Sequence, residues 1–225
     1  MKVDPDGAGL DADRLERITT HLTSRYVDAG KIAGCEVAVV RHGAVGYHRS
    51  FGVRDRERDV PVDEGTIWRI YSMTKPIAGV ALMTLFEHGL FQLDDPVHRW
   101  IPEWRDLRLA DGSTPERPMS VRDTLMHMTG LPGALNAAGT LADLMAAMVE
   151  LRGGKDGTLD DLAANLATKP LTFAPGTRWQ YGVSTDIVGL LVQRISGKRF
   201  DEYLQDAIFG PLQMVDTGFV VPDDK

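Results

Sequence analysis

A chain of 225 residues with 43% hydrophobic and 25% charged residues can bury a sizeable core, and this composition excludes a disordered protein as the default. The formal net charge is −7 and Arg and Lys are scattered among acids, so we expect no nucleic-acid partner. The apolar stretches fall short of the ~20 residues of a bilayer span, and residues 1–20 are rich in charge rather than apolar like a signal peptide. We therefore expect a cytoplasmic protein with no membrane partner, unless a leader was removed.

Residues 10–29 predict an amphipathic helix, because apolar side chains recur there at three- and four-residue spacing. These side chains are Leu15, Ile18, Leu22 and Tyr26. Two β-rich segments at 35–41 and 45–51 then predict a hairpin. The only cysteine, Cys35, excludes an intrachain disulfide, and its apolar-alternating surroundings favour a buried structural thiol.

The stretch RIYSMTKPI, residues 69–77, opens the next predicted helix, which runs from about Ser72 to His88. Apolar residues wrap most of its circumference, so we expect it to be buried on nearly all sides. Pro76 is compatible with a helix only near the first turn. It therefore places Ser72 near the positive end of the helix.

The remaining chain predicts short helices and loops. Ser120, with Asp123 three residues later, is typical of a helix N-cap, and a Gly- and Pro-rich stop follows at 130–133. Further helices are predicted at 140–151, 158–168, 185–196 and 200–208. Only two strands are convincing, and a lone hairpin is marginally stable. The sequence thus predicts either a helical protein with a β-ribbon or a sheet whose other strands lie outside this sequence.

Motifs of several enzyme classes do not occur in the sequence. It contains no Walker A motif, no G-x-G-x-x-G and no G-x-S-x-G elbow. His88, His98 and His127 are ten or more residues apart and lack the spacing of zinc ligands. We expect no metal and no organic cofactor.

Ser72 and Lys75 form a Ser-x-x-Lys motif, which a chain of this length yields by chance about once. Its place at a helix start brings both side chains to the same face. A serine nucleophile needs a base, and burial near the positive end of a helix disfavours a protonated lysine. The backbone N–H of Ser72 would also be an oxyanion donor. The alternative is a plain N-cap serine beside a surface lysine, and the local pattern leaves both interpretations open.

Tyr181 follows the turn at Pro175 and Gly176 and precedes a predicted helix, so its phenol could carry a proton for a serine–lysine pair. Most tyrosines in such places are packing residues, and spacing alone favours packing here. We interpret His127 as structural rather than catalytic. Asp186 is interpreted as a cap for the helix at 185–196.

Three blocks together resemble the serine β-lactamase and penicillin-binding-protein family, and most closely its class C-like branch that contains the family VIII carboxylesterases. The blocks are SMTKP, LMHMTGLPG and FAPGTRWQYGVSTDIVGLLVQRISGKRFDEYLQDAIFGPLQMVDTGF, and the resemblance runs from about residue 11 to the end. It implies that Ser72 is the acylated nucleophile, Lys75 its base partner and Tyr181 the tyrosine of the second motif. Tyr71, Trp179 and Val183 are the candidate substrate-binding residues, and packing is the alternative role of Trp179.

The fold that this resemblance implies is an α/β fold of the α+β type, with an antiparallel sheet flanked by helices and a helical domain packed against it. We expect residues 1–90 to form the N-terminal part of the α/β domain and residues 91–180 a mainly helical domain. Residues 181–225 would supply helices that return to the α/β domain.

Two departures from the family pattern matter. In the β-lactamases of this branch the second motif reads Tyr-x-Asn and the asparagine helps to hold the substrate amide, whereas this chain has Val183, which resembles the esterase members. The third motif, a Lys-Thr-Gly-like or His/Trp-x-Gly segment on a later strand, has no match after Tyr181. We therefore expect the C-terminal strands to lie outside this chain, in a C-terminal fragment of the same protein that is cut off, carried as a second chain or deleted.

The sequence thus predicts a serine hydrolase that cleaves small-molecule carboxylic esters, with short acyl chains, through an acyl-enzyme on Ser72. Within the same fold the alternatives are a β-lactamase or D-alanyl-D-alanine peptidase and an acyltransferase. An inactive binding or regulatory domain is the alternative from another class.

Overall fold

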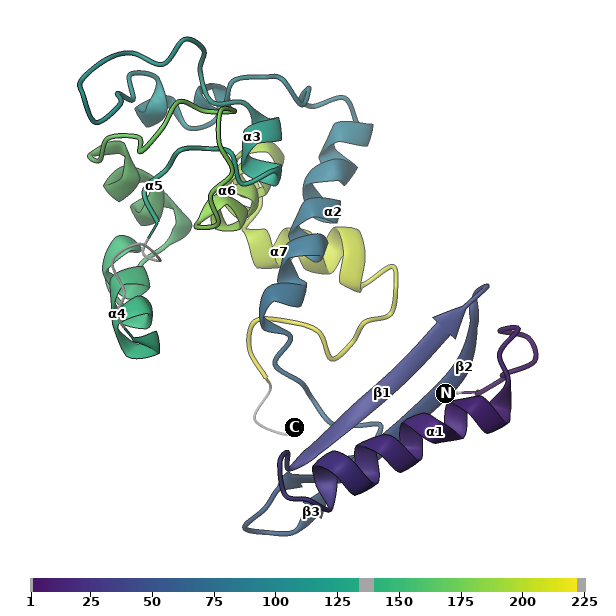
Figure 1. Ribbon diagram of the computed structural model, residues 1–225. Coiled ribbons are helices and arrows are strands. Elements are labelled where there is room, and N and C mark those ends of the chain that lie inside the picture. The colour runs from purple at the N-terminus through teal and green to yellow at the C-terminus, as the bar shows by residue number, and fades with distance from the viewer. Residues whose placement is uncertain (1, 134–139, 222–225) are drawn as a thin grey trace. The chain divides into compact units, whose positions relative to one another are not determined.

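The structure is a computed structural model that describes residues 2–133 and 140–221 (Figure 1). The chain divides into two compact units, residues 1–68 and residues 69–225. The three-part division expected from the sequence stays a prediction. Within the described ranges, the structure contains no helix with both the length and the apolar character needed to cross a bilayer.

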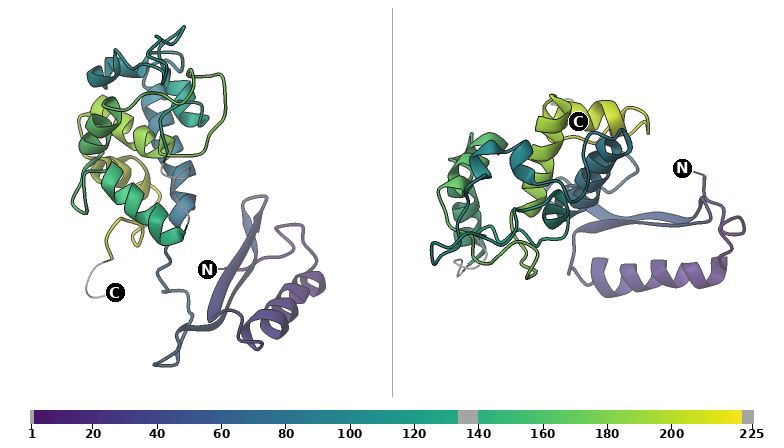
Figure 2. Two further views of the ribbon diagram at one scale, coloured as in Figure 1. Left: turned by 60° about the vertical axis from the view of Figure 1, so that its left-hand side comes forward. Right: turned by 90° about the horizontal axis from the view of Figure 1, so that it is seen from above.

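The first unit packs one helix along an antiparallel sheet (Figure 2). Its elements are α1 (Ala12–Leu22), η1 (Thr23–Val27), β1 (Gly34–Arg41), β2 (Ala44–Asp55) and β3 (Val60–Pro61). Asp11 caps α1 by accepting a hydrogen bond from the backbone N–H of Arg14 at 2.9 Å. A hydrogen bond of 2.9 Å between the hydroxyls of Thr19 and Tyr47 ties α1 to β2. The helix predicted over residues 10–29 is confirmed, with a wider turn, η1, at its end.

The predicted hairpin is confirmed as the pair β1 and β2, and β3 extends the sheet in the order β1-β2-β3. The sequence did not predict β3, which has two residues. Cys35 lies in β1 opposite Phe51 and is partly rather than fully buried. This burial raises the pKa of its thiol.

The second unit is helical throughout its described elements. These elements are η2 (Tyr71–Met73), α2 (Thr74–Glu87), η3 (Val97–Arg99), η4 (Pro102–Trp104), α3 (Val121–Leu125), α4 (Leu141–Leu151), α5 (Leu159–Ala167), α6 (Ser184–Ser196), α7 (Phe200–Leu204) and η6 (Gln205–Phe209). The helix α6 has α2, α3, α5 and α7 as neighbours and is at the centre of the core. The helices predicted at 140–151, 158–168, 185–196 and 200–208 are confirmed.

The helix α2 is apolar around its circumference, and the sequence predicts its burial on nearly all sides. The structure does not show such burial. Ala81 and Leu82 are fully buried in the core that α2 shares with α6. Val80 is 54% exposed, because α6 covers a different face of the helix. The prediction of near-complete burial is therefore wrong for α2 as the structure describes it.

Helix starts differ across this unit. The helices α3, α4 and α5 follow Ser120, Thr140 and Thr158, and each start is a complete capping box with an aspartate three residues later. The N-cap predicted at Ser120 is therefore confirmed. Ser72 lies inside the 3₁₀ turn η2 that leads into α2, so its interpretation as an N-cap is wrong.

The predicted cap at Asp186 is also wrong. The residue lies in the first turn of α6, where the N-cap position belongs to Val183 and has no side-chain cap. The Asp186 carboxylate instead accepts a hydrogen bond from Nη2 of Arg152 at 2.6 Å. This ion pair links the C-terminal end of α4 to the start of α6.

Candidate active site

Ser72 and Lys75 are brought together by the turn η2 and the first turn of α2. Lys75 Nζ donates a hydrogen bond of 2.8 Å to Ser72 Oγ. The serine is exposed, whereas the lysine is partly buried. An accessible hydroxyl bonded to an amine is the arrangement that nucleophilic catalysis by a serine requires.

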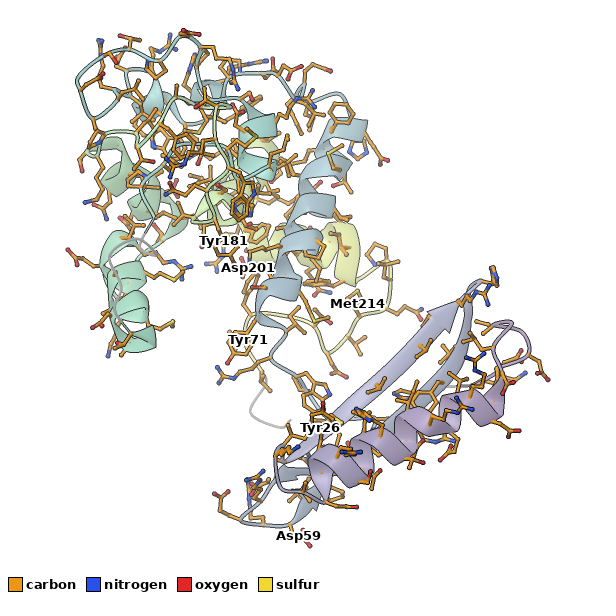
Figure 3. All side chains as sticks on the ribbon, viewed as in Figure 1. Tyr26, Asp59, Tyr71, Tyr181, Asp201 and Met214 are labelled. Atoms are coloured by element: carbon orange, nitrogen blue, oxygen red, sulfur yellow. The ribbon has the colours of Figure 1, made fainter. Side chains whose placement is uncertain are left out.

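The backbone directly before the serine adopts an unusual conformation. Tyr71 has a φ of 43°, in the left-handed region that bulky residues rarely adopt. Strained backbone of this kind is concentrated at functional sites. The side chain of Tyr71 is 77% exposed and lies at the segment that leads into α2 (Figure 3).

Tyr181 reaches the same place from a distant part of the sequence. Lys75 Nζ lies 5.2 Å from the centroid of the Tyr181 ring. Hydrogen bonding with Lys75, and next with Ser72, lowers the pKa of the Tyr181 phenol and outweighs the opposing effect of burial. The Tyr181 phenol, which lies near the amine of Lys75, therefore loses its proton more readily than the phenol of an ordinary tyrosine.

A loop hydrogen-bonded to the end of α3 carries Tyr181 into this position. Three backbone N–H groups in the segment 172–180 donate to three carbonyl oxygens in the segment 127–130. The pairs are Thr172 to Gly130, Gly176 to Met128 and Gln180 to His127, each at 2.8 Å. Because backbone hydrogen bonds fix direction as well as distance, the two segments hold each other in register.

The start of α3 is itself anchored by a buried carboxylate. Asp123 is 3% exposed and accepts two hydrogen bonds from the Arg117 guanidinium, at 2.6 and 2.8 Å. Burial alone would raise the pKa of Asp123, but hydrogen bonds from Arg117 and Ser120 outweigh it and lower the pKa. This ionised anchor fixes the helix from which His127 and the segment 127–130 continue.

The imidazole of His127 lies against the Tyr181 ring. The two ring centroids are 5.1 Å apart and the planes are 22° from parallel, which is a stacked arrangement. Sequence reasoning interpreted His127 as structural and did not place it beside the tyrosine. Its position after a one-turn helix was a local signal for an unusual backbone, but such a signal does not indicate a neighbour about 50 residues away.

The candidate substrate-binding residues differ in exposure. Trp179 is 62% exposed, and its ring lies 6.5 Å from that of Tyr181 and 6.2 Å from that of His127. Val183 is 7% exposed and belongs to the helical core. Of the three candidates, Tyr71 and Trp179 are therefore the two that present their side chains to solvent.

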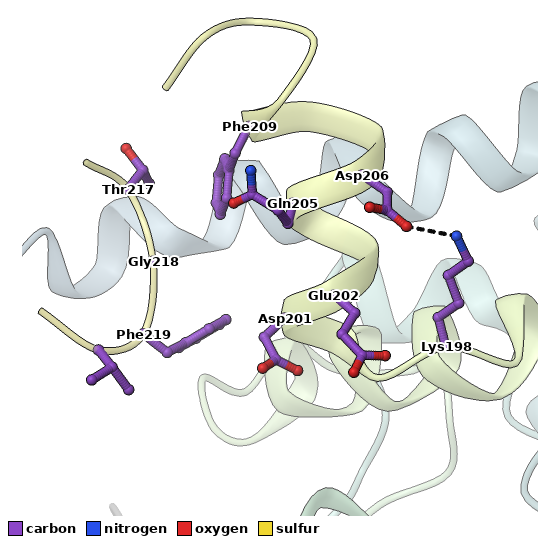
Figure 4. A pocket seen from close by; sticks show the side chains of 10 residues that line it. Lys198, Asp201, Glu202, Gln205, Asp206, Phe209, Thr217, Gly218 and Phe219 are labelled. Carbon is purple, nitrogen blue, oxygen red and sulfur yellow. Dashed lines mark hydrogen bonds and ion pairs between the residues drawn. The ribbon is translucent and has the colours of Figure 1, made fainter. Parts of the chain in front are cut away.

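A hollow of about 550 Å³ lies elsewhere in this unit, between α7, η6 and residues 217–220 (Figure 4). Lys198 donates a 2.6 Å hydrogen bond to Asp206 at its edge. Ser72, Lys75 and Tyr181 do not line this hollow. Across the described part of the chain, no three His, Cys, Asp or Glu residues are placed to hold a metal ion.

At Gly130 the two hydrogen-bonded segments approach each other closely. Its φ is 74°, and a Cβ at this position would lie 2.1 Å from the carbonyl oxygen of Phe173. We expect Gly130→Ala to push away the loop that carries Tyr181, and therefore to lower both the thermal midpoint and any turnover that depends on Tyr181. Thermal unfolding and steady-state kinetics measure the two effects.

Gly112→Ala is the matched control, because Gly112 has a φ of 84° and a Cβ there would meet nothing within 4 Å. It should show only the cost of a left-handed alanine, about 1–2 kcal/mol. Equal effects of the two substitutions would contradict the role given to the close approach at Gly130.

Nearly the whole chain is similar to known proteins in sequence and in fold. A sequence model of the family described as Beta-lactamase matches residues 19–225. The chain is 37% identical over 221 residues to Esterase EstB of Burkholderia gladioli, an alignment that covers 97% of this chain and 55% of that protein.

Solved structures give a concordant result. The chain superposes on EstCE1, described as a hydrolase with promiscuous acyltransferase activity, with a TM-score of 0.80 and 29% identity, covering 95% of this chain and 54% of that one. It also superposes on the simvastatin synthase LovD of Aspergillus terreus, with a TM-score of 0.70, 25% identity and coverage of 90% and 52%. The chain thus spans about half the length of the relatives it matches.

Proposed function

Since the chain belongs to the beta-lactamase family, we propose that it carries the nucleophile of a serine hydrolase that cleaves carboxylic esters with short acyl chains. The observation that carries the proposal is the 2.8 Å hydrogen bond from Lys75 Nζ to Ser72 Oγ, with the centroid of the Tyr181 ring 5.2 Å from the same Lys75 nitrogen. The similarity to Esterase EstB supports an ester as the substrate. Val183, which has no amide to offer a substrate, favours an ester over a β-lactam.

In the proposed reaction Ser72 Oγ attacks the carbonyl carbon of the ester, and its proton passes to the Lys75–Tyr181 pair. The tetrahedral intermediate collapses, the carbon–oxygen bond to the alcohol breaks, and the pair returns a proton to the leaving alkoxide. Water then attacks the acyl-enzyme in the same way and releases the acid. The lowered pKa of Tyr181 supports its use as the proton carrier.

The proposal includes a further segment of the protein that completes the active site. The family relatives are about twice as long as the matched chain, and we propose that a C-terminal segment of the same protein supplies the remaining site residues. Intact mass spectrometry of the purified protein tests this through a co-purifying fragment or a longer chain. A lone 24.7 kDa species with full activity would argue against the segment.

An acyltransferase is the second candidate, because EstCE1 is described as a hydrolase with promiscuous acyltransferase activity. The two reactions share the acyl-enzyme and differ in whether water or an alcohol removes the acyl group. Product analysis with p-nitrophenyl butyrate and increasing concentrations of a simple alcohol separates them, since only an acyltransferase accumulates the new ester.

The function itself is tested by covalent labelling and by substrate choice. We expect a fluorophosphonate probe to modify Ser72, which peptide mass spectrometry locates, and p-nitrophenyl butyrate to be turned over faster than nitrocefin. Faster turnover of nitrocefin would favour a β-lactamase. An unmodified Ser72 in the intact protein, together with no turnover, would instead identify a binding or regulatory domain.

A further inference from the structure

We infer that His127 is a positioning residue that holds the ring of Tyr181, and thereby its phenol oxygen, beside Ser72 and Lys75. The inference rests on the proposed function, in which Tyr181 carries the proton. The near-parallel stack, with centroids 5.1 Å apart and planes at 22°, carries the inference. By comparison, the Trp179 ring lies 6.5 Å from Tyr181 at 39° and is mostly exposed. Of these two aromatic neighbours, His127 lies closer to the Tyr181 ring and more nearly parallel to it.

The Tyr181 ring requires a packing contact of this kind to hold it in place. It is 40% exposed, and it stands on a loop rather than within a helix. A ring that can move would displace the phenol oxygen, and a misplacement of 1 Å can lower a rate about 10²-fold. Lys75 approaches the ring at 5.2 Å and His127 stacks on it at 5.1 Å, so two contacts restrain it.

His127 acts on the tyrosine loop through its backbone as well as its side chain. Its carbonyl oxygen accepts a 2.8 Å hydrogen bond from the N–H of Gln180, the residue before Tyr181. Its own φ of 56° is left-handed, a conformation that histidine tolerates better than most residues. The unusual backbone therefore turns the imidazole and the carbonyl toward the same loop.

The imidazole performs this role as a neutral ring. Among the described residues, Nδ1 of His127 is the buried side-chain nitrogen or oxygen atom without a hydrogen-bond partner. Burial, and next the nearby Lys75 charge, lower the pKa of His127. Because the pKa is lowered and Nδ1 has no partner that would accept a hydrogen bond from an added proton, the uncharged ring is the form that stacks on Tyr181 at neutral pH.

Two substitutions separate the ring from the backbone. His127→Phe keeps a flat ring and loses both nitrogens, whereas His127→Asn tolerates the left-handed backbone and loses the ring. If the ring positions Tyr181, the Phe variant retains kcat within about threefold and the Asn variant loses about 10- to 100-fold in kcat with little change in KM. If His127 serves only the backbone conformation, the order is reversed, and that result would overturn the inference.

A double-substitution cycle tests whether His127 acts through Tyr181. We expect His127→Asn to have no further effect on kcat when Tyr181 is already phenylalanine, because the group that His127 positions is then missing. The same loss in both backgrounds would identify a general structural effect and overturn the inference. Thermal unfolding of each variant in the whole protein verifies that it is folded. If the Asn variant does not fold, the Phe variant alone decides, since a loss above tenfold contradicts the positioning role.

Titration of the Tyr181 phenol gives a readout that does not depend on turnover. Difference absorbance of phenolate, with Tyr181→Phe as the blank, should show the phenol titrating at higher pH in His127→Asn than in the unaltered protein or His127→Phe. An unchanged titration in the Asn variant would overturn the inference. If this pattern is observed but no Ser72-dependent ester turnover exists, the proposed function fails while the positioning role stands.

Discussion

Replacement of Ser72 by alanine is expected to lower kcat for p-nitrophenyl butyrate by on the order of 10⁵–10⁶-fold, the loss seen when a serine nucleophile is removed from a cooperating group of residues. The reason is chemical, because alanine has no oxygen to form the acyl-enzyme and no acceptor for Lys75 Nζ, which is now 2.8 Å from Ser72 Oγ. The fold should be unaffected, since Ser72 is exposed and does not cap α2. Kinetics and fluorophosphonate labelling measure the loss.

Ser24→Ala is the matched control for this result. Ser24 is exposed, and its hydroxyl donates a 2.7 Å hydrogen bond to the carbonyl of Thr20 within the first unit. Alanine is a good helix former, so the control should keep both turnover and labelling. Full ester turnover by Ser72→Ala would show that another group is the nucleophile, and the mechanism proposed above would be wrong.

Replacement of Lys75 by methionine is expected to lower kcat about 10²- to 10⁴-fold, the range for loss of a general acid–base group. The same change should raise the pKa of Tyr181, because hydrogen bonding with Lys75 is the largest cause of its lowering. The direction of this change in the pKa of Tyr181 follows from the role of Lys75. A lowered pKa means that the phenol loses its proton at lower pH than usual, and loss of the ammonium group moves that step to higher pH. Phenolate absorbance against pH measures the shift.

Lys198→Met provides the control for the removal of a lysine. Lys198 pairs with Asp206 at the edge of the surface hollow (Figure 4), and Tyr181 is not among the residues that line this hollow. Its substitution should leave both kcat and the Tyr181 titration unchanged. A Lys75→Met protein with unaltered titration of Tyr181 would mean that the two side chains are not coupled in solution.

Much of the fold could be predicted because its signals are local. Ser120 and Asp123 announce a capping box within four residues, and Pro76 restricts where α2 begins. Two elements of the structure were not predicted, because neither has a distinct pattern in the sequence. A two-residue strand such as β3 has no periodicity, and the 3₁₀ turn that holds Ser72 has the same sequence features as the first turn of an α-helix.

In the candidate site, too, contacts between residues close in sequence could be predicted, whereas contacts between distant residues could not. The contact between Ser72 and Lys75 follows from three-residue spacing at a helix start, and the structure has it. The place of Tyr181 came from a family resemblance, since it depends on tertiary hydrogen bonds between distant segments. The stack of His127 on Tyr181 had no sequence signal, because ring geometry is set by packing rather than by spacing. The catalytic roles of these residues stay predictions.

The hydrogen bonds between segments 172–180 and 127–130 join parts of the chain that are far apart in sequence, so they have a consequence for the order of folding. Ser72 and Lys75 are three residues apart and can meet as soon as α2 forms, on a microsecond scale or faster. Tyr181 is more than 100 residues farther along the chain and arrives only after a long loop has closed, which is slower. We therefore expect a newly made chain to pair this hydroxyl and amine before the phenol reaches them, so that the three groups proposed for the reaction meet only late in folding.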